Sequence, residues 1–134
     1  YNCRLGDPET EVIIPRIKSD LVNLLSSAVN KELKGESIII SDDSAATVML
    51  VSAGYPGEFQ KNKEISGTEN IRNSLIFHAG TLSVDDKILT NGGRVIAITT
   101  LSQDFTRAVQ ISLNNADEIK FEGKYYRRDI GFDL

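Results

Sequence analysis

Residues suited to binding charged oxygen groups lie at the very start of the chain. Asn2, Arg4, Asp7 and Glu9 surround a Gly-Asp-Pro turn. The planar guanidinium of Arg4 suits two-point binding of a carboxylate or of a phosphoryl group in transfer, although without further context an ion pair at the surface is the simpler interpretation. The amide oxygen of Asn2 is a hard ligand suited to Mg²⁺, but alone it would not hold a metal ion. This functional segment at position 1 predicts that the chain is a C-terminal fragment of a longer protein.

The elements that must position these residues begin at the turn itself. Asp7, Pro8 and Glu9 have the order expected of a helix start, with Asp7 as the cap, and Pro15 keeps this helix short. A second helix is expected from Ser19 or Asp20, with Ser19 as the cap, to Leu33, where Gly35 ends it. Its apolar residues recur with the helical period between positions 21 and 33, so we expect them in the core, with a face for a partner protein as the less favoured alternative.

Beyond Gly35 the apolar residues alternate with a period of two. Strands are expected at residues 45–53, 74–79, 87–90 and 94–101, with a last one near 119–121, and Asn91-Gly92 is the strongest hairpin signal. A helix capped by Ser102 or Asp104 should reach about Asn115. This pattern predicts an α+β fold with antiparallel hairpins, similar to a barrel-sandwich hybrid, and two main helices.

Composition limits the classes of function. The 134 residues carry 19 acids against 15 bases, a net charge of -4, which disfavours a nucleic-acid partner. Cys3 and His78 are the single cysteine and histidine, so the chain alone can form neither an internal disulfide nor a zinc site, and this usage fits a reducing cytosol. No apolar run approaches the ~20 residues that span a membrane.

Four groups of residues carry a family resemblance. They are Asn2-Cys3-Arg4-Leu5-Gly6-Asp7-Pro8-Glu9-Thr10; Ala53-Gly54-Tyr55-Pro56-Gly57; His78-Ala79-Gly80-Thr81 with Asn91-Gly92-Gly93-Arg94-Val95; and Tyr126-Arg127-Arg128-Asp129-Ile130-Gly131. In this order and at about these separations, they resemble the C-terminal part of phosphoribosylamine-glycine ligases, also called glycinamide ribonucleotide synthetases, of the ATP-grasp superfamily. The resemblance implies that residues 1–34 end an ATP-grasp domain and that residues 35–134 form the ligase C-terminal domain.

The resemblance also implies an activity. Such enzymes act in cytoplasmic purine biosynthesis: ATP phosphorylates the carboxylate of glycine, and the amine of 5-phosphoribosylamine attacks the glycyl phosphate. Mg²⁺ or Mn²⁺ accompanies ATP in this family. The resemblance implies that Asn2 binds this metal ion together with a Glu, which in the family pattern stands immediately before the position of Tyr1. Because the remaining nucleotide-binding parts lie upstream in the family, the chain alone is expected to be inactive and to bind no cofactor.

The same resemblance suggests roles for individual residues. Arg4 is the first candidate for catalysis, acting on the carboxylate or the transferring phosphoryl group. Asp7 or Glu9 would orient the ribosyl amine, with helix capping as the equally weighted alternative. Thr81 and Arg94 would contact substrate, although a role in turn formation or strand pairing is as well supported.

Three other residues or groups are expected to be structural. His78 is interpreted as a hydrogen-bonded structural residue. Cys3 is expected to pack away from the site, and the group Arg127, Arg128 and Asp129 to be a paired surface cluster.

Two alternative functions remain open on the sequence alone. A barrel-sandwich module that carries biotin or lipoate would present a lysine at a hairpin tip, and Lys87 after Asp85-Asp86 lacks the usual neighbours. Another ATP-grasp ligase, such as a biotin-dependent carboxylase, would have a different sequence from Gly6 to Glu9.

Overall fold

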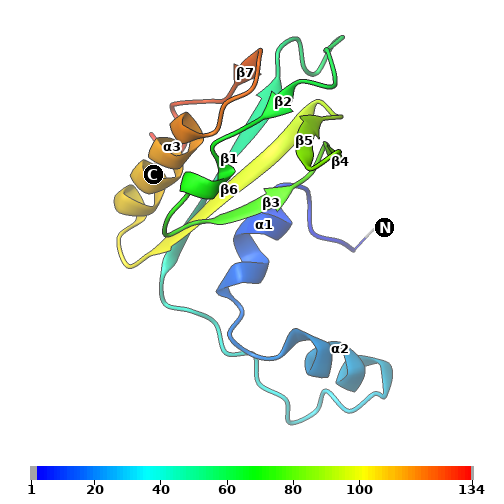
Figure 1. The fold of residues 1–134 in the computed structure, drawn as a ribbon. Helices are drawn as coiled ribbons and strands as arrows, with labels where there is room; N and C mark the ends of the chain where they lie inside the picture. The colour runs from blue at the N-terminus through cyan, green and yellow to red at the C-terminus, as the bar shows by residue number, and fades with distance from the viewer. Residues whose placement is uncertain (1–2, 134) are drawn as a thin grey trace.

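The structure is a computed structural model that describes residues 3–133, and it is an α+β fold with antiparallel sheets (Figure 1). Among these residues, no helix combines the length and apolar composition needed to cross a membrane. The helices are α1 (Glu9–Ile13), α2 (Leu21–Val29) and α3 (Phe105–Glu118), with short 3-10 turns at Ile14–Arg16 and Thr68–Asn70. The strands are β1 (Ser44–Ser52), β2 (Glu64–Ile65), β3 (Leu75–His78), β4 (Thr81–Val84), β5 (Lys87–Thr90), β6 (Arg94–Ser102) and β7 (Lys124–Tyr125).

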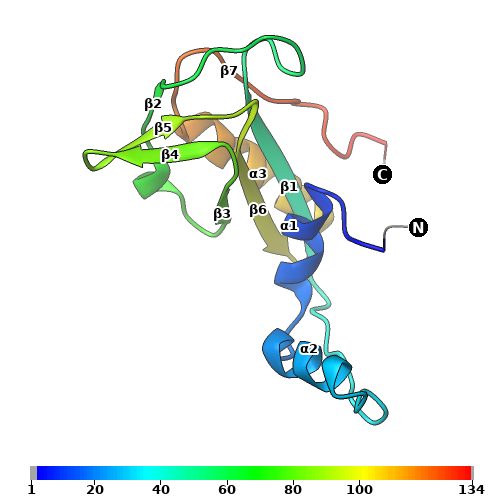
Figure 2. The ribbon, with the colours of Figure 1, turned by 90° about the vertical axis from the view of Figure 1, so that its right-hand side faces the viewer.

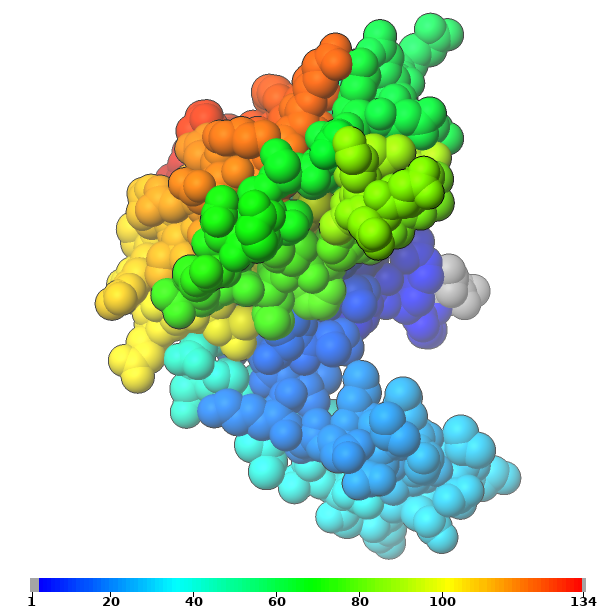
Figure 3. Space-filling view, viewed as in Figure 1, coloured from blue at the N-terminus to red at the C-terminus, as the bar shows by residue number. Residues whose placement is uncertain are grey.

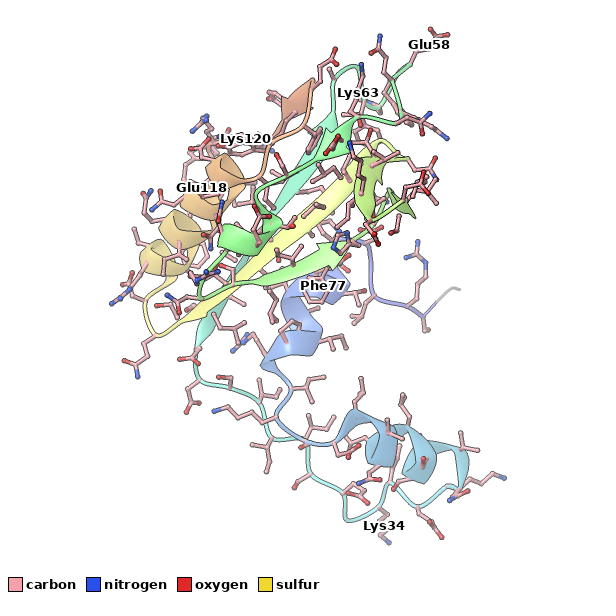
Figure 4. The ribbon with its side chains drawn as sticks, in the orientation of Figure 1. Lys34, Glu58, Lys63, Phe77, Glu118 and Lys120 are labelled. Carbon is pink, nitrogen blue, oxygen red and sulfur yellow. The ribbon has the colours of Figure 1, made fainter. Side chains whose placement is uncertain are left out.

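The larger sheet has the strand order β3-β6-β1-β7 and is covered on both faces near its centre. Thr99 and Thr100 are neighbours on β6, so their side chains point to opposite faces. The Thr100 hydroxyl bonds to Ser112 of α3 at 2.7 Å, whereas the Thr99 hydroxyl donates to the Glu11 carbonyl of α1 at 2.9 Å. The two helices therefore lie on opposite sides of the sheet, and Phe77 of β3 lies on the α1 side (Figure 4).

The core lies mainly between this sheet and α3. Its fully buried side chains include Val48, Leu50, Ile96, Ile98 and Ile119. The run Val95–Ile98 is buried throughout because β6 is covered on both faces, which explains why it reads as continuous rather than alternating apolar sequence. α3 begins as expected, with the Asp104 side chain accepting from the Arg107 amide at 2.7 Å.

The smaller sheet has the order β2-β5-β4 and corrects one prediction. The hairpin turn joins β4 to β5 at Asp85-Asp86, whose φ values are 47° and 61°, and not at Asn91-Gly92. Asn91-Gly92 instead carries the chain from the small sheet to the large one. Both residue pairs can form tight turns. Which pair joins two hydrogen-bonded strands depends on how the strands pair in the folded protein, and the local sequence does not specify that pairing. β4 itself was not expected from the sequence.

The largest departure from expectation concerns α2. This helix begins at the cap Asp20, whose side chain accepts from the Asn23 amide at 3.0 Å, and not at Ser19. It ends at Val29, because the backbone turns left-handed at Lys31, well before Gly35. The prediction that its apolar residues lie in the core is wrong: within α2 only Leu24 is buried. The helix projects away from the two sheets (Figures 1 and 2).

Candidate functional site

The turn before α1 is held by its own side chains. The Gly6 amide donates to the Glu9 carboxylate at 2.7 Å, and the Thr10 amide and hydroxyl both donate to the Gly6 carbonyl, at 3.1 and 3.0 Å. A Glu in the first helical turn that reaches back to an earlier amide is a known capping device. Glu9 therefore has a structural role at this turn, while the predicted cap, Asp7, makes no capping bond.

Asp7 instead joins the N-terminal segment to the sheet. One guanidinium nitrogen of Arg94, on β6, lies 2.9 Å from the Asp7 carboxylate, and the other donates to the Asp7 carbonyl at 2.9 Å. Arg94 thus binds Asp7 at two points across 87 positions of sequence. Both side chains remain partly exposed, at 47% for Asp7 and 36% for Arg94, so a bound molecule can still approach them.

Arg4 takes no part in these contacts. Its guanidinium donates to the Leu5 carbonyl at 3.0 Å and takes part in no ion pair with residues 3–133. The surface ion pair that the sequence left open for Arg4 is not found within this part of the chain. Most of its donors are available for an anion. Cys3 beside it is exposed, so the prediction that this side chain packs against the protein is wrong.

The described residues do not form a metal site by themselves. Residues 3–133 contain no group of three His, Cys, Asp or Glu side chains placed to hold an ion. The Asp7 carboxylate pairs with Arg94, and the Glu9 carboxylate accepts from the Gly6 amide. Asn2, the predicted metal ligand, lies outside the described residues, and its role stays a prediction.

A cavity of about 300 Å³ lies beside the Asp7 turn. It is lined largely by apolar and aromatic side chains, with two arginines among them. Its wall includes Pro8, Tyr55, Arg94 and Tyr126, one residue from each of the four groups quoted in the sequence analysis, together with Met49, Val51, Tyr125, Arg127 and Ile130. Four segments that lie far apart in the sequence therefore meet at one place.

Close backbone packing explains several glycines around this cavity. A Cβ on Gly93 would lie 2.1 Å from a ring carbon of Tyr55, and one on Gly80 would lie 2.6 Å from the Cα of Gly92. The Gly80 amide also donates to the Arg94 carbonyl at 2.8 Å. These glycines let the turn after β3 and the start of β6 approach each other and let Tyr55 cover them.

Thr81 lies outside the cavity wall. Its hydroxyl shares a 3.1 Å hydrogen bond with Nδ1 of His78 across the turn between β3 and β4. His78 thus has the hydrogen bond expected of a structural residue. The structure brings Arg94 and Asp7 together but does not place Thr81 with them, so a substrate contact by Thr81 stays a prediction.

The C-terminal part of the wall is fixed by a cluster that the sequence did not predict. The Tyr126 hydroxyl and the guanidinium of Arg128 both bond to the Asp117 carboxylate, and Arg128 also lies over the Tyr126 ring, 4.9 Å from its centre. Lys124 donates to the carbonyls of Ala116 and Ile119, both at 2.6 Å, and so satisfies the end of α3. Arg127 pairs separately with Asp129 at 2.9 Å, which agrees with the predicted surface cluster.

These contacts shift the ionisation of the cluster. Burial, together with the hydrogen bond to Asp117, raises the pKa of Tyr126 to about 12. The hydrogen bonds from Arg128 and Tyr126 lower the pKa of Asp117, and burial lowers the pKa of Lys124. Asp117 is therefore charged and Tyr126 protonated at neutral pH, the states that their mutual hydrogen bond requires.

Comparison with known proteins assigns this fold to a family. A family model described as "Phosphoribosylglycinamide synthetase, C domain" matches residues 45–133. The chain belongs to this family. It is 42% identical to a phosphoribosylamine-glycine ligase of Fusobacterium nucleatum, over 98% of this chain and 32% of that protein. It is 43% identical to a trifunctional purine biosynthetic protein adenosine-3 of Gallus gallus, over 98% of this chain and 14% of that protein.

A solved structure gives the same assignment for the fold. The crystal structure of a phosphoribosylamine-glycine ligase from Thermotoga maritima matches 96% of this chain and 32% of its own, with a TM-score of 0.76 and 38% identity. The chain thus spans about a third of the length of the bacterial ligases it matches, and it corresponds to their C-terminal part.

Proposed function

We propose that this chain is the C-terminal part of an ATP-dependent phosphoribosylamine-glycine ligase, which joins glycine to 5-phosphoribosylamine. The observation that carries the proposal is the meeting of four separate sequence groups around the cavity beside Asp7. Family membership and the names of the relatives support it. The single exposed thiol of Cys3 fits a reducing compartment, and we propose the cytoplasm.

Within this function Arg4 is the residue proposed to contact the reacting groups. The reaction must bring the glycine carboxylate and a phosphate of ATP together, and both are anionic. A guanidinium with free donors can bind the carboxylate or the transferring phosphoryl group at two points. Asp7 and Glu9 support this role by shaping the turn that presents Arg4, and Asp7 keeps carboxylate surface with which to orient the amine.

The metal and nucleotide are proposed to bind largely through the preceding part of the ligase. Mg²⁺ or Mn²⁺, when bound with ATP, would neutralise phosphate charge. Asn2 is the one ligand that this chain is proposed to supply. The described residues do not fit a complete site, since Mg²⁺ favours carboxylates and the nearby ones are paired. We therefore expect no binding of ATP and Mg²⁺ by the chain alone, and micromolar binding in a calorimetric titration would contradict this.

The barrel-sandwich carrier is not supported by any contact in the structure. Lys87 lies at the start of β5, next to the β4–β5 turn, and pairs with Glu64 of β2 at 2.8 Å. A carrier lysine has to leave the surface freely to move its cofactor between sites. We therefore keep the ligase as the proposed function.

The test is made in the intact ligase that contains this sequence. Arg4→Ala is expected to lower kcat by about 100-fold or more while changing the KM for ATP by less than about threefold, because its interactions form mainly in the transition state. Arg4→Lys, which keeps the charge but not the planar fork, should recover part of the rate. Arg16→Ala serves as a control, since Arg16 bonds to the Ser41 carbonyl at the base of α2. Turnover within twofold of wild type for Arg4→Ala would remove Arg4 from the reaction.

A further inference from the structure

The end of β1 and the loop after it are fastened to the segment that leads into β6. The Ser52 amide donates to the Gly93 carbonyl at 2.8 Å, and the Ser52 hydroxyl donates to the Gly92 carbonyl at 2.9 Å. Gly93 also packs its backbone against the ring of Tyr55, since a Cβ there would lie only 2.1 Å from a ring carbon. These contacts fix the backbone immediately before Arg94.

Tyr55 is itself held in place by its own loop. Its amide donates to the Ser52 carbonyl at 3.1 Å, and the Gly57 amide donates to the Gly54 carbonyl at 2.7 Å, which closes the turn around it. The Tyr55 ring meets Phe59 edge to face, with the ring centres 6.4 Å apart and the planes at 62°. This is a favoured arrangement of two aromatic rings. The ring that packs on Gly93 therefore has a defined position.

Arg94 connects this fixed segment to the N-terminal turn. Its guanidinium binds the Asp7 carboxylate and the Asp7 carbonyl, both at 2.9 Å. The donors of a guanidinium lie in one plane, so such a two-point contact depends on the position of the backbone that carries the arginine. The turn needs this support, because the N-terminal segment, in dark blue in Figure 3, lies at the surface of the molecule.

We propose that Tyr55 is a positioning residue for the ligase reaction. Its ring fixes the backbone at Gly93, and the next residue, Arg94, holds Asp7 where that carboxylate can orient the ribosyl amine. The inference rests on the proposed function, which gives Asp7 this task. The atoms of Tyr55 that face Gly93 are the ring carbons Cγ, Cδ2 and Cε2, so the role belongs to the ring and not to the hydroxyl.

The competing interpretation is a direct contact between Tyr55 and a substrate. Tyr55 and Arg94 both line the cavity of about 300 Å³, and Tyr55 is 40% exposed, so its hydroxyl could donate to a bound molecule. A positioning role has two consequences that a substrate contact lacks. Removal of the ring should loosen the turn when no substrate is present, and removal of the hydroxyl alone should have little effect.

The first experiment uses the chain without substrate. The Thr10 amide donates to the Gly6 carbonyl, so its hydrogen exchange reports opening of the turn. Tyr55→Leu should accelerate this exchange about three- to tenfold, and Tyr55→Phe less than about twofold. Phe132→Leu is the matched control, because this aromatic ring is 75% exposed and should not affect Thr10. Amides at the centre of β6 separate a general loss of stability from opening of the turn.

A double-mutant cycle tests whether the effect passes through Arg94. In a chain that already carries Arg94→Met, the contact that Tyr55 supports is gone. Adding Tyr55→Leu should then change the exchange of the Thr10 amide by less than about twofold. Fully additive effects of the two substitutions would overturn the proposal, because Tyr55 would then hold the turn by a route that does not include Arg94.

The second experiment measures the reaction in the intact ligase that contains this sequence. Tyr55→Leu should lower kcat/KM for 5-phosphoribosylamine by about fivefold or more. The KM for ATP should change less than about twofold, because ATP is proposed to bind largely through the preceding part of the ligase. Tyr55→Phe should recover the wild-type rate to within about twofold. An equal loss for the Phe and Leu variants would assign the hydroxyl to the substrate and overturn the positioning role.

The two experiments separate this inference from the proposed function. A wild-type ligase that does not join glycine to 5-phosphoribosylamine contradicts the proposed function, whereas hydrogen exchange needs no substrate and still tests the contacts of Tyr55. Unchanged exchange of the Thr10 amide in Tyr55→Leu overturns the positioning role, whatever the activity. Faster exchange with unchanged turnover also overturns it, because the position of the turn would then not matter to the reaction.

Discussion

The contact between Arg94 and Asp7 offers the sharpest test of how the N-terminal turn is held. Asp7→Asn removes the ion pair but leaves the bond from Arg94 to the Asp7 carbonyl. Both side chains are partly exposed, so the loss should be about 0.2–1 kcal/mol. Arg94→Met removes both interactions, and with about 1 kcal/mol for the second hydrogen bond the total loss becomes about 1–2 kcal/mol.

The assay must report the turn rather than the whole fold. The Thr10 amide donates to the Gly6 carbonyl inside the turn, and its hydrogen exchange measures local opening. Exchange at Thr10 should accelerate about fivefold or less for Asp7→Asn and about 5- to 30-fold for Arg94→Met. Amides of β6 serve as the internal control, because the core strand should exchange only through global unfolding.

Salt separates the two interactions. Raising the ionic strength to about 1 M shortens the screening length to about 3 Å, so the effect of Asp7→Asn should shrink while most of the Arg94→Met effect persists. Equal effects of the two substitutions would refute the two-point contact. No acceleration for Arg94→Met would show that other contacts, such as the bond from Thr99 to Glu11, hold the segment without it.

The remaining predictions concern the walls of the cavity. The fold lowers the pKa of Asp117, so the charged carboxylate stabilises the protein above pH 3.8, the ordinary pKa of the group, and this stabilisation is lost as the pH falls further. Asp117→Asn should therefore weaken the fall in the free energy of unfolding at acid pH, as measured by urea denaturation. Tyr126 has a pKa raised from 10.0 to about 12, so its protonated hydroxyl stabilises the fold below pH 10, and this stabilisation is lost between pH 10 and 12. Tyr126→Phe should remove this fall in the free energy of unfolding at alkaline pH. Gly93→Ala should cost about 1–3 kcal/mol by displacing the Tyr55 ring, whereas Gly57→Ala, whose Cβ would meet only the Gly54 carbonyl oxygen at 3.1 Å, should cost less in the same urea denaturation. An equal loss for Gly57→Ala would contradict the role given to the Tyr55 ring.

Much of the secondary structure follows from local signals. The strand over residues 45–53 and the helix capped by Asp104 are confirmed to within a few residues, because alternation and capping depend on near neighbours. The predicted structural hydrogen bond of His78 is also present. The Asn91-Gly92 hairpin was wrong because a turn signal does not say whether the two flanking strands pair with each other or with others.

The candidate site shows the same division. Residue types drew attention to Arg4 and Asp7 at the glycine turn, and the family resemblance made them candidates for the site. That Asp7 meets Arg94, and that Pro8, Tyr55 and Tyr126 share one cavity, depends on contacts across most of the chain. The cluster of Asp117, Tyr126 and Arg128 was missed for the same reason, because its members come from α3 and from the segment after β7.

The sequence by itself determined the α+β class, the family resemblance and the types of residue at the N-terminal turn, because periodicity, capping and motif order are properties of neighbouring positions. Only the tertiary structure decided which of those residues are engaged and which are free. In the structure Asp7 pairs with Arg94, and the Glu9 carboxylate accepts from the Gly6 amide. The Arg4 guanidinium bonds only to the Leu5 carbonyl among residues 3–133. The fold also turns the apolar face of α2 outward. Helical periodicity identifies an apolar face, but only the arrangement in space shows that residues 3–133 leave the face of α2 uncovered.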